Sequence, residues 1–509
     1  MSKVLRNIVY NGLGQGLGLL VGFVAVRYVF RRLGGDALGL IYFSLAFSTA
    51  LTVAVQLGIC ESAVREVASH HGNRPEYIKS FIRTSSTLYW VAYLVLAIVA
   101  YTASPYLVHH WVKLNSLDPV TAITIMRILS LGALVSLPGG LYRAMLTGLQ
   151  HMGLTNVIDV SAKALQQAGI FGILSLHGNL FHVSYWIVAS MVVQVAVTWV
   201  ACSRYFSLRS LLVPGLSLAV VKENMGFASG LIAITLCSWV LGQVDRVIIS
   251  KLLPLALLGI YTFARSAISQ GQLLTSAINT AIFPHFSALH GSGKKEELKK
   301  AYTRIHDLIC LGTVPIFAAV PFAAIPVFSR MFDMPSARLL LLPATFLTIG
   351  TYINGTLTSP YVVLLAKGRT DIAAKQNIGA LFVVVPVSIV SIYFFGLNGA
   401  GFSWVVYGLF AYAYGVPMAC RECLGMPARA WYWHVGRIMG LALLIYGGAW
   451  VGIASHRSFY VPYLVAAYVA GTIVYCAVSF RIMDPAMRES IMSFVQLWRL
   501  KSREVMVAD

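Results

Sequence analysis

Charged residues are scarce in this chain. Only 11% of its 509 residues are Asp, Glu, Lys or Arg, while 58% are hydrophobic; a soluble domain carries roughly 25% charged residues. The longest polar interruptions span about 20–30 residues, close to the length of one membrane-crossing helix, which leaves no room for a soluble catalytic domain. The composition therefore predicts an all-α membrane protein that is not an enzyme.

Nucleotide and metal motifs are missing too. The glycine run NGLGQGLGLLVG at residues 11–22 lacks the third glycine of a dinucleotide-binding loop, and there is no Walker motif. The histidines show no metal-ligand spacing on a shared face, and Cys420 and Cys423 form one CxxC pair without a second. We expect reduced thiols there rather than a zinc or redox site. The sequence predicts no catalytic residue, no cofactor and no metal.

Acidic residues are few, at 18 against 38 Lys and Arg. The basic residues do not gather on a soluble face, which argues against a nucleic-acid partner. They concentrate instead in the N-terminus, every second connection and the C-terminus, most densely at residues 65–83 and 290–304. The positive-inside rule places both termini in the cytoplasm. The N-terminus lacks a small-residue cleavage site, so we expect the first helix to be retained.

Apolar segments of spanning length recur and predict about fourteen transmembrane helices. Their approximate ranges are 7–31, 37–60, 84–104, 119–138, 154–176, 180–202, 226–250, 256–283, 303–328, 337–365, 371–395, 398–418, 434–454 and 458–480. The stretches at 26–46 and 244–264 resemble each other and suggest two duplicated halves, as in many transporters. The predicted parts are an N-lobe (1–205), a cytoplasmic linker (206–225), a C-lobe (226–425), two further helices (426–482) and a cytoplasmic amphipathic tail (483–509).

One predicted helix, 256–283, carries a polar stripe. Its members step by three or four residues and so share one helical face; they are Arg265, Ser269, Gln272, Ser276 and Asn279. A stripe of this length facing lipid would be costly. It therefore predicts either the wall of a water-filled cavity, which the Arg favours, or a polar seam buried against neighbouring helices.

Other ionisable residues occur at membrane depth, and most are basic. Asp159 and Lys163 are four residues apart on one helix, where they could line a cavity or simply neutralise each other. Arg27 could reach the outer headgroups by its long stem. The full set is Arg27, Arg127, Lys163, Arg246 and Arg265 against Asp159 and Asp245. This cationic balance favours an anion site suited to a phosphate group over a set of scattered structural charges.

Several segments carry a family resemblance that spans the chain. They are RRLGGDALGLIYFSLA (31–46), QLGICESAVREVASHHG (56–72), QVDRVIISKLLPLALLGIYTFARSAI (243–268), LAKGRTDIAAKQNIG (365–379) and FGLNGAGFSWVV (395–406). In their order and spacing the chain resembles the multidrug/oligosaccharidyl-lipid/polysaccharide (MOP) exporter superfamily. Within it, the chain is similar to the polysaccharide transporter branch of Wzx-type O-antigen flippases.

The resemblance implies a V-shaped pair of six-helix lobes in the inner (cytoplasmic) membrane. It also implies a substrate, an undecaprenyl-pyrophosphate-linked oligosaccharide such as an O-antigen, capsule or exopolysaccharide unit. Such a unit would move from the inner to the outer leaflet by alternating access, with H⁺ or Na⁺ as the coupling ion. Membrane lipids, a glycan polymerase and a chain-length regulator are the other expected partners. The alternatives are a multidrug/cation antiporter of the same superfamily and a membrane glycan polymerase or ligase.

Specific residues can be assigned to this expected function. The substrate would meet Arg246, Arg265, Lys163, Arg27, Arg127, Gln272 and Asn279. Asp245 or Asp159 would be the ion-coupling carboxylate, although Asp245 could equally brace its own lobe. Asp245 and Arg246 are neighbours in sequence and therefore point about 100° apart on a helix. Which of the two faces the cavity is left open by the sequence.

Overall fold

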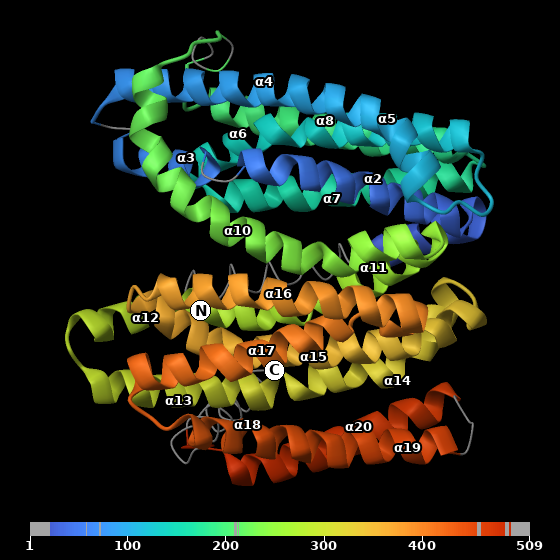
Figure 1. The fold of residues 1–509 in the computed structure, drawn as a ribbon, viewed down its shortest axis with the longest axis vertical. Helices are drawn as coiled ribbons and strands as arrows, with labels where there is room; N and C mark the ends of the chain where they lie inside the picture. The colour runs from blue at the N-terminus through green and yellow to red at the C-terminus, as the bar shows by residue number, and fades with distance from the viewer. Residues whose placement is uncertain are drawn as a thin grey trace, which may run out of the picture. The chain divides into compact units, whose positions relative to one another are not determined.

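The computed structural model describes residues 21–56, 59–70, 73–207, 211, 213–455, 460–483 and 488–489. In these ranges the regular structure is helical (Figure 1), apart from one isolated bridge between Lys113 and Pro254. Residues 21–33 are helical. The further helices are α2 (Gly35–Gln56), α3 (Ile59–His70), α4 (Pro75–Tyr106), η1 (Leu107–Trp111), α5 (Pro119–Leu134), α6 (Ser136–Gly148), α7 (Met152–Ser175), α8 (Leu180–Ser203), α10 (Leu218–Leu252), α11 (Leu255–Ser269), α12 (Gln272–Gly291), α13 (Lys295–Gly312), α14 (Val314–Met331), α15 (Met334–Ala366), α16 (Thr370–Phe395), η2 (Gly396–Gly399), α17 (Phe402–Ala419), η3 (Cys420–Leu424), α18 (Ala428–Ala442), η4 (Leu443–Gly447), α19 (Gly448–Ser455) and α20 (Val461–Ile482).

The helices confirm an all-α, multi-pass membrane protein. Ten helical segments in the described part of the chain are long and apolar enough to cross a bilayer. The other predicted spans are 7–31, 226–250, 256–283 and 398–418. None of these four is among the ten segments found in the described part of the chain, and the first lies partly outside that part. The count of fourteen and the cytoplasmic termini therefore stay predictions.

The charged connections contain more helix than we expected. Most of the predicted inside loop 65–83 is helical, because α3 continues to His70 and α4 already begins at Pro75. Proline at a first helical position loses no hydrogen bond and presets the backbone, which explains this early start. The basic stretch near residue 295 likewise opens α13, with Glu296 and Glu297 in its first turn. Acidic side chains there are favourable to the helix dipole.

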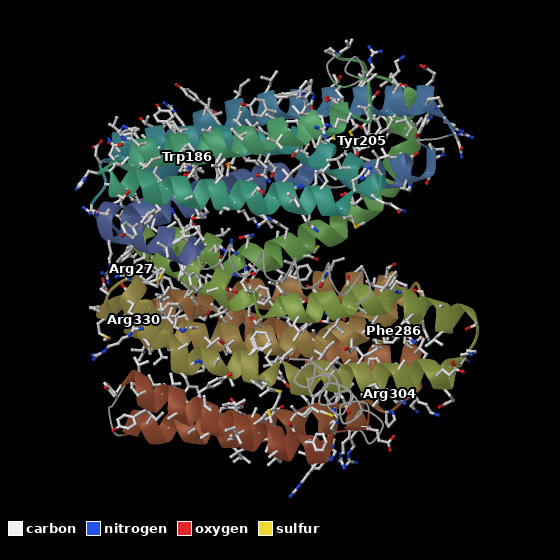
Figure 2. The ribbon with its side chains drawn as sticks, turned by 180° about the vertical axis from the view of Figure 1, so that it is seen from behind. Arg27, Trp186, Tyr205, Phe286, Arg304 and Arg330 are labelled. Atoms are coloured by element: carbon white, nitrogen blue, oxygen red, sulfur yellow. The ribbon has the colours of Figure 1, made fainter. Side chains whose placement is uncertain are left out.

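The chain divides into two compact units, described separately below. Unit 1 comprises residues 1–264, 331–336 and 385–400. Helices α4, α5 and α8 run alongside one another in it (Figure 1). Two glycines allow this approach, because a Cβ on Gly132 of α5 or Gly139 of α6 would collide with Val188 or Val195 of α8. Figure 2 shows Arg27 near one end of this unit and Tyr205 at the opposite end.

Unit 2 comprises residues 265–330, 337–384 and 401–509. Its last helices are tied to α13 and α14 by side-chain donors on backbone carbonyls. Tyr475 of α20 donates to Leu311 O at 3.2 Å, and Tyr468 donates to Pro315 O at 3.0 Å. The Leu311 carbonyl is available because Pro315, four residues later, has no N–H to offer it. A proline inside an apolar segment thus creates the acceptor for a distant tyrosine.

These units do not coincide with the predicted lobes 1–205 and 226–425. Helix α10, which we assigned to the C-lobe, packs against α2, α3 and α4 of unit 1. The lobe division therefore stays a prediction. Most of the predicted amphipathic tail (483–509) and the glycine run at 11–22 lie outside the described residues.

Candidate functional site

Asp245 and Arg246 have different environments although they are adjacent on α10. The Asp245 side chain is fully buried, and Tyr261 of α11 donates a 2.6 Å hydrogen bond to its Oδ2. A buried carboxylate needs such a donor, because an unpaired charge away from water is costly. Arg246 is half-buried and lines a cavity. Of the two, the structure gives the cavity position to Arg246 and the position bridging α10 and α11 to Asp245.

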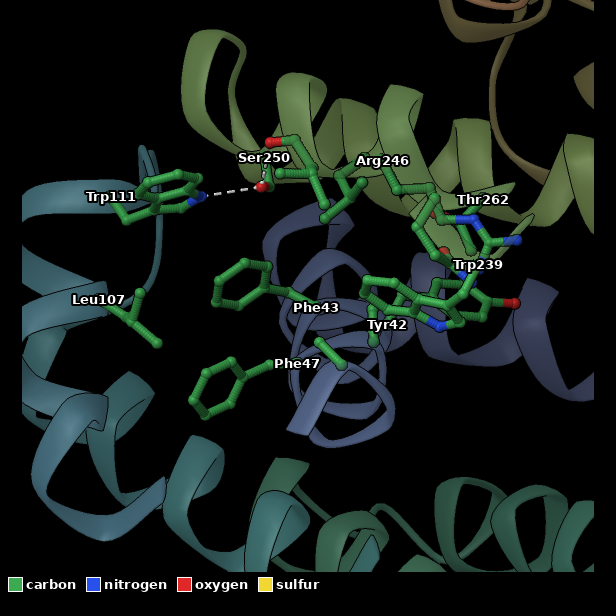
Figure 3. A pocket seen from close by; sticks show the side chains of 14 residues that line it. Tyr42, Phe43, Phe47, Leu107, Trp111, Trp239, Arg246, Ser250 and Thr262 are labelled. Atoms are coloured by element: carbon green, nitrogen blue, oxygen red, sulfur yellow. Dashed lines mark hydrogen bonds between the residues drawn. The ribbon is translucent and has the colours of Figure 1, made fainter. Parts of the chain in front are cut away.

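The cavity lies inside unit 1 and has a volume of about 160 Å³. Helices α2, η1, α10 and α11 all contribute to its walls, which are mainly apolar and include five aromatic rings (Figure 3). The rings are those of Tyr42, Phe43, Phe47, Trp111 and Trp239, and the polar side chains are Gln243, Arg246, Ser250 and Thr262. We call this space the aromatic cavity. Figure 3 shows the Arg246 guanidinium beside Tyr42, Trp239 and Thr262.

Polar contacts hold η1 and the segment after it against the end of α10. Trp111 Nε1 donates to Ser250 Oγ at 3.0 Å, and Lys251 Nζ donates to His110 O at 2.6 Å. Lys113 Nζ donates to Leu252 O at 2.8 Å. These bonds fix the position of the Trp111 ring, and with it one wall of the aromatic cavity.

Two polar atoms in the cavity wall are available to a ligand. Trp239 Nε1 and Gln243 Oε1 are buried and have no hydrogen-bond partner in the part of the chain that the structure describes. Buried polar atoms are normally paired. One donor, one acceptor and a guanidinium among aromatic faces can together bind an anionic or hydroxyl-rich group next to an apolar one.

Arg265 occupies a second, separate environment, in unit 2. Its side chain is only 7% exposed, and its Cζ lies 4.5 Å from the ring centroid of Trp404 in α17. This distance is typical of a cation–π contact. The backbone of α17 lies close to α15 at this point, because a Cβ on Gly350 would collide with the Cβ and the carbonyl carbon of Trp404. The prediction that Arg265 lies away from lipid is consistent with this burial.

The predicted helix 256–283 is not continuous. α11 ends at Ser269, residues 270–271 form a turn, and α12 begins at Gln272. Glycine weakens a helix, and Gly271 is needed here because a Cβ would come within 2.6 Å of Phe317. The five residues of the stripe are therefore divided between two helices, α11 and α12.

The members of the stripe differ in exposure. Ser269 and Ser276 are exposed, and their hydroxyls donate to carbonyls of their own helices. Gln272 is half-buried, whereas Asn279 is 9% exposed. Asn279 Nδ2 is buried without a partner among the described residues. Of the two amides predicted to meet substrate, Asn279 is the one with a buried, available donor.

Asp159 does not pair with Lys163. Its Oδ1 lies 3.0 Å from Arg143 Nη2 of α6 and accepts a 2.8 Å hydrogen bond from Gln194 Nε2 of α8. Lys163 is exposed on the same helix, α7. Sequence reasoning missed Arg143 and Gln194, because a pattern within one helix cannot show which neighbouring helix supplies a partner.

The two remaining predicted residues lie away from the aromatic cavity. Arg127 Nε donates to Tyr101 O at 3.2 Å, and its Cζ lies 3.8 Å from the Tyr101 ring centroid, so Arg127 joins α5 to α4. Arg27 is exposed near the end of unit 1 shown in Figure 2. Neither lines the aromatic cavity.

The CxxC pair lies in η3, at the predicted cytoplasmic end of α17. Both thiols are free and buried. Burial raises the pKa of Cys420 to about 11 and also raises the pKa of Cys423. A raised thiol pKa disfavours the thiolate, which is the reactive and metal-binding form. In the described ranges, no group of three or more His, Cys, Asp and Glu side chains has the geometry of a metal site.

Comparison with known proteins places the chain among membrane transporters. Residues 4–290 match the family described as "Polysaccharide biosynthesis protein". A Shigella flexneri protein named "Putative O-antigen transporter" is 20% identical over 407 residues, which cover 79% of this chain and 94% of that protein.

Two solved structures share the fold. The lipid II flippase MurJ, in an inward closed conformation, is similar with a TM-score of 0.73, 11% identity and coverage of 93% of this chain and 99% of MurJ. An inward-facing multidrug resistance MATE family transporter of the MOP superfamily is similar with a TM-score of 0.67 and 16% identity. That match covers 80% of this chain and 94% of the transporter.

Proposed function

Since this chain belongs to the polysaccharide biosynthesis protein family, we propose that it is a flippase for an undecaprenyl-pyrophosphate-linked oligosaccharide. The unit would be an O-antigen, capsule or exopolysaccharide repeat, moved from the inner to the outer leaflet of the cytoplasmic membrane by alternating access. The known proteins it resembles are named as transporters and flippases, not as enzymes. A shared fold alone does not identify the substrate, so the proposal also rests on the residues of the candidate site.

The observation that carries the proposal is the position of Arg246 in the aromatic cavity. A pyrophosphate is the charged group common to every such lipid-linked glycan, and a guanidinium offers it a planar, permanently charged set of donors. Aromatic faces suit the apolar faces of sugar rings or the first prenyl units. A cation antiporter would be served better by an acidic lining, and the described residues that line this cavity include no Asp or Glu.

The other predicted residues differ in how directly they could contact the substrate. Arg265 on Trp404, with Asn279, supplies a second cationic and hydrogen-bonding group in unit 2. Lys163 is exposed and would meet only the polar part of the substrate. Arg27 and Arg127 lie outside the aromatic cavity. Between the two candidate coupling carboxylates, we favour Asp159. Its side chain is 29% exposed and can exchange an ion with water, whereas Asp245 is fully buried.

Deleting the gene and measuring surface glycan tests the function. We expect loss of the glycan from the cell surface together with accumulation of its lipid-linked repeat unit on the inner leaflet. Re-expression of the chain at native level restores export. A deletion strain with normal surface glycan and lowered resistance to cationic drugs would instead establish the antiporter. Normal flipping with unpolymerised units at the surface would point to a polymerase.

A further inference from the structure

A second cavity of unit 1 lies at the start of α4, apart from the sites described above. It has a volume of about 290 Å³, and residues 215–217 of the segment that leads into α10 form one of its walls. The opposite wall is the first part of α4, which contributes Glu76, Lys79, Ser80, Arg83 and Thr84. We call this space the polar cavity. Figure 1 shows the start of α10 beside α4 at one end of unit 1.

Arg83 is held in the wall of the polar cavity by backbone carbonyls. Its Nε donates to Val213 O at 3.2 Å, and its Nη2 donates to Pro214 O at 2.9 Å. Gly215 permits this approach, because a Cβ there would come within 2.9 Å of Arg83 Nε. A guanidinium has five N–H donors, so two bonds to neutral carbonyls leave donors over. In the described part of the chain, Arg83 has no acidic partner that would neutralise its charge.

Lys79 adds a second positive charge to the polar cavity. Its Nζ lies 3.5 Å from Glu76 Oε2, and the Glu76 side chain is 86% exposed. An ion pair this open to water contributes little and is easily displaced. The charged side chains that the structure places around the cavity are thus two basic and one acidic. A ligand with a single negative charge balances them.

The depth of the polar cavity along α4 matches the headgroup region of a bilayer. The lipid-exposed apolar surface of α4 begins at Trp90, which is 43% exposed, and continues through Leu94 and Ile98. Arg83 lies about two helical turns, or about 10 Å, before Trp90. Tryptophan favours the membrane interface, so the cavity lies where lipid phosphates are found. Leu216 lines the cavity and is 60% exposed, which offers an acyl chain an apolar contact.

The groups in the polar cavity suit a lipid phosphate. Lys79, Arg83 and the Ser80 hydroxyl can all donate to phosphate oxygens, and the two charged donors make the stronger bonds. The volume is at the lower end of small-molecule sites, which begin at about 300 Å³, and so fits a headgroup rather than a whole lipid. We propose that the polar cavity binds the headgroup phosphate of an anionic phospholipid, which fastens residues 213–217 to α4.

Lipid titration of the purified full-length protein tests the binding. Phosphatidylglycerol is added in detergent, and the first bound lipid is measured by native mass spectrometry. Lys79→Gln should weaken this binding about fivefold, the effect of one basic residue at a lipid headgroup. Glu76→Gln removes the acidic group beside the phosphate and should strengthen it by a similar factor. Lys300→Gln, at an exposed position of α13, is the matched control and should bind like the wild type.

These variants leave Arg83 unchanged, because Arg83 also fixes the backbone of residues 213–214. Wild-type affinity in Lys79→Gln, or weaker binding in Glu76→Gln, would overturn the proposal. So would equal affinity of the wild type for phosphatidylcholine, which has no net charge.

Hydrogen exchange locates the bound lipid. Gly215 N donates to Thr87 Oγ1 at 3.0 Å, and Ser217 N donates to Thr84 Oγ1 at 3.1 Å, so exchange at these two N–H groups reports detachment from α4. With phosphatidylglycerol at about ten times its Kd, we expect about tenfold slower exchange. Unchanged exchange, or equal slowing by inorganic phosphate alone, would overturn the lipid as the ligand. Neither measurement needs a glycan, so both are independent of the proposed transport function.

Discussion

The surroundings of Arg246 in unit 1 and of Arg265 in unit 2 show two ways of holding an arginine at membrane depth. Arg246 is half-buried in a cavity with several rings and with unpaired polar atoms nearby. Arg265 is 7% exposed and packed on the ring of Trp404, whose backbone lies close to Gly350 of α15. The first arrangement leaves the guanidinium reachable, and the second fixes its position. We therefore expect direct binding from Arg246 and a precisely placed charge from Arg265.

The largest effect is expected from reversing the charge in the aromatic cavity. Arg246→Glu should lower surface-glycan export by about 100-fold, because a favourable charge-assisted contact is replaced by repulsion of the pyrophosphate. Export is measured in a deletion strain carrying each variant at native expression. Arg127→Glu, outside the cavity, is the matched control and should export normally. Equal losses of export in both variants would mean that any negative charge introduced at membrane depth impairs export, and that the aromatic cavity has no special role.

A smaller loss is expected where Arg265 is positioned indirectly. Trp404→Leu removes the cation–π contact and should reduce export by about fivefold to tenfold, in line with roughly 1–1.4 kcal/mol for a buried contact of this kind. Trp404→Phe retains a ring face and should stay close to the wild type. If the Leu and Phe variants export equally, the ring does not position Arg265.

Removing the hydrogen bond to Asp245 should lower the stability of the protein rather than its binding of substrate. Tyr261→Phe removes the hydrogen bond to the buried Asp245 carboxylate and should cost about 1–3 kcal/mol of unfolding free energy. Thermal unfolding of the purified protein measures this, with Tyr42→Phe in the cavity wall as the matched control. An unchanged melting temperature in Tyr261→Phe would show that the bond between Asp245 and Tyr261 does not stabilise the packing of α10 on α11.

The smallest effect is expected at the surface contact between α4 and α5. Arg127→Ala breaks the Arg127 contacts with Tyr101 and should lower stability by about 0.5–1 kcal/mol, typical of an exposed cation–π contact. Export should be unchanged. A strong export defect at wild-type stability would indicate that Arg127 contacts the substrate. Arg246 in the aromatic cavity would then not differ in function from the basic residues outside it.

Much of the fold was predictable because hydropathy is a local property. The segments 154–176 and 180–202 fall within a residue or two of α7 and α8. The prediction of one helix over 256–283 was wrong at residues 270–271. There, Gly271 must lack a side chain because Phe317, from a different helix, packs against it. It could not identify Arg143 as the partner of Asp159, because the two lie on different helices.

By itself, the sequence determined the class of molecule: an all-α membrane protein with basic residues at membrane depth and the features of a family of transporters. Residues 245 and 246 show what only the tertiary structure decided. Adjacent positions on a helix point about 100° apart, so either side chain could have faced the cavity. The position of Tyr261 gave Asp245 a buried donor, and the rings of α2, η1 and α10 left Arg246 to line the cavity. Burial and partners come from helices distant in sequence, which is why no local pattern contained the answer.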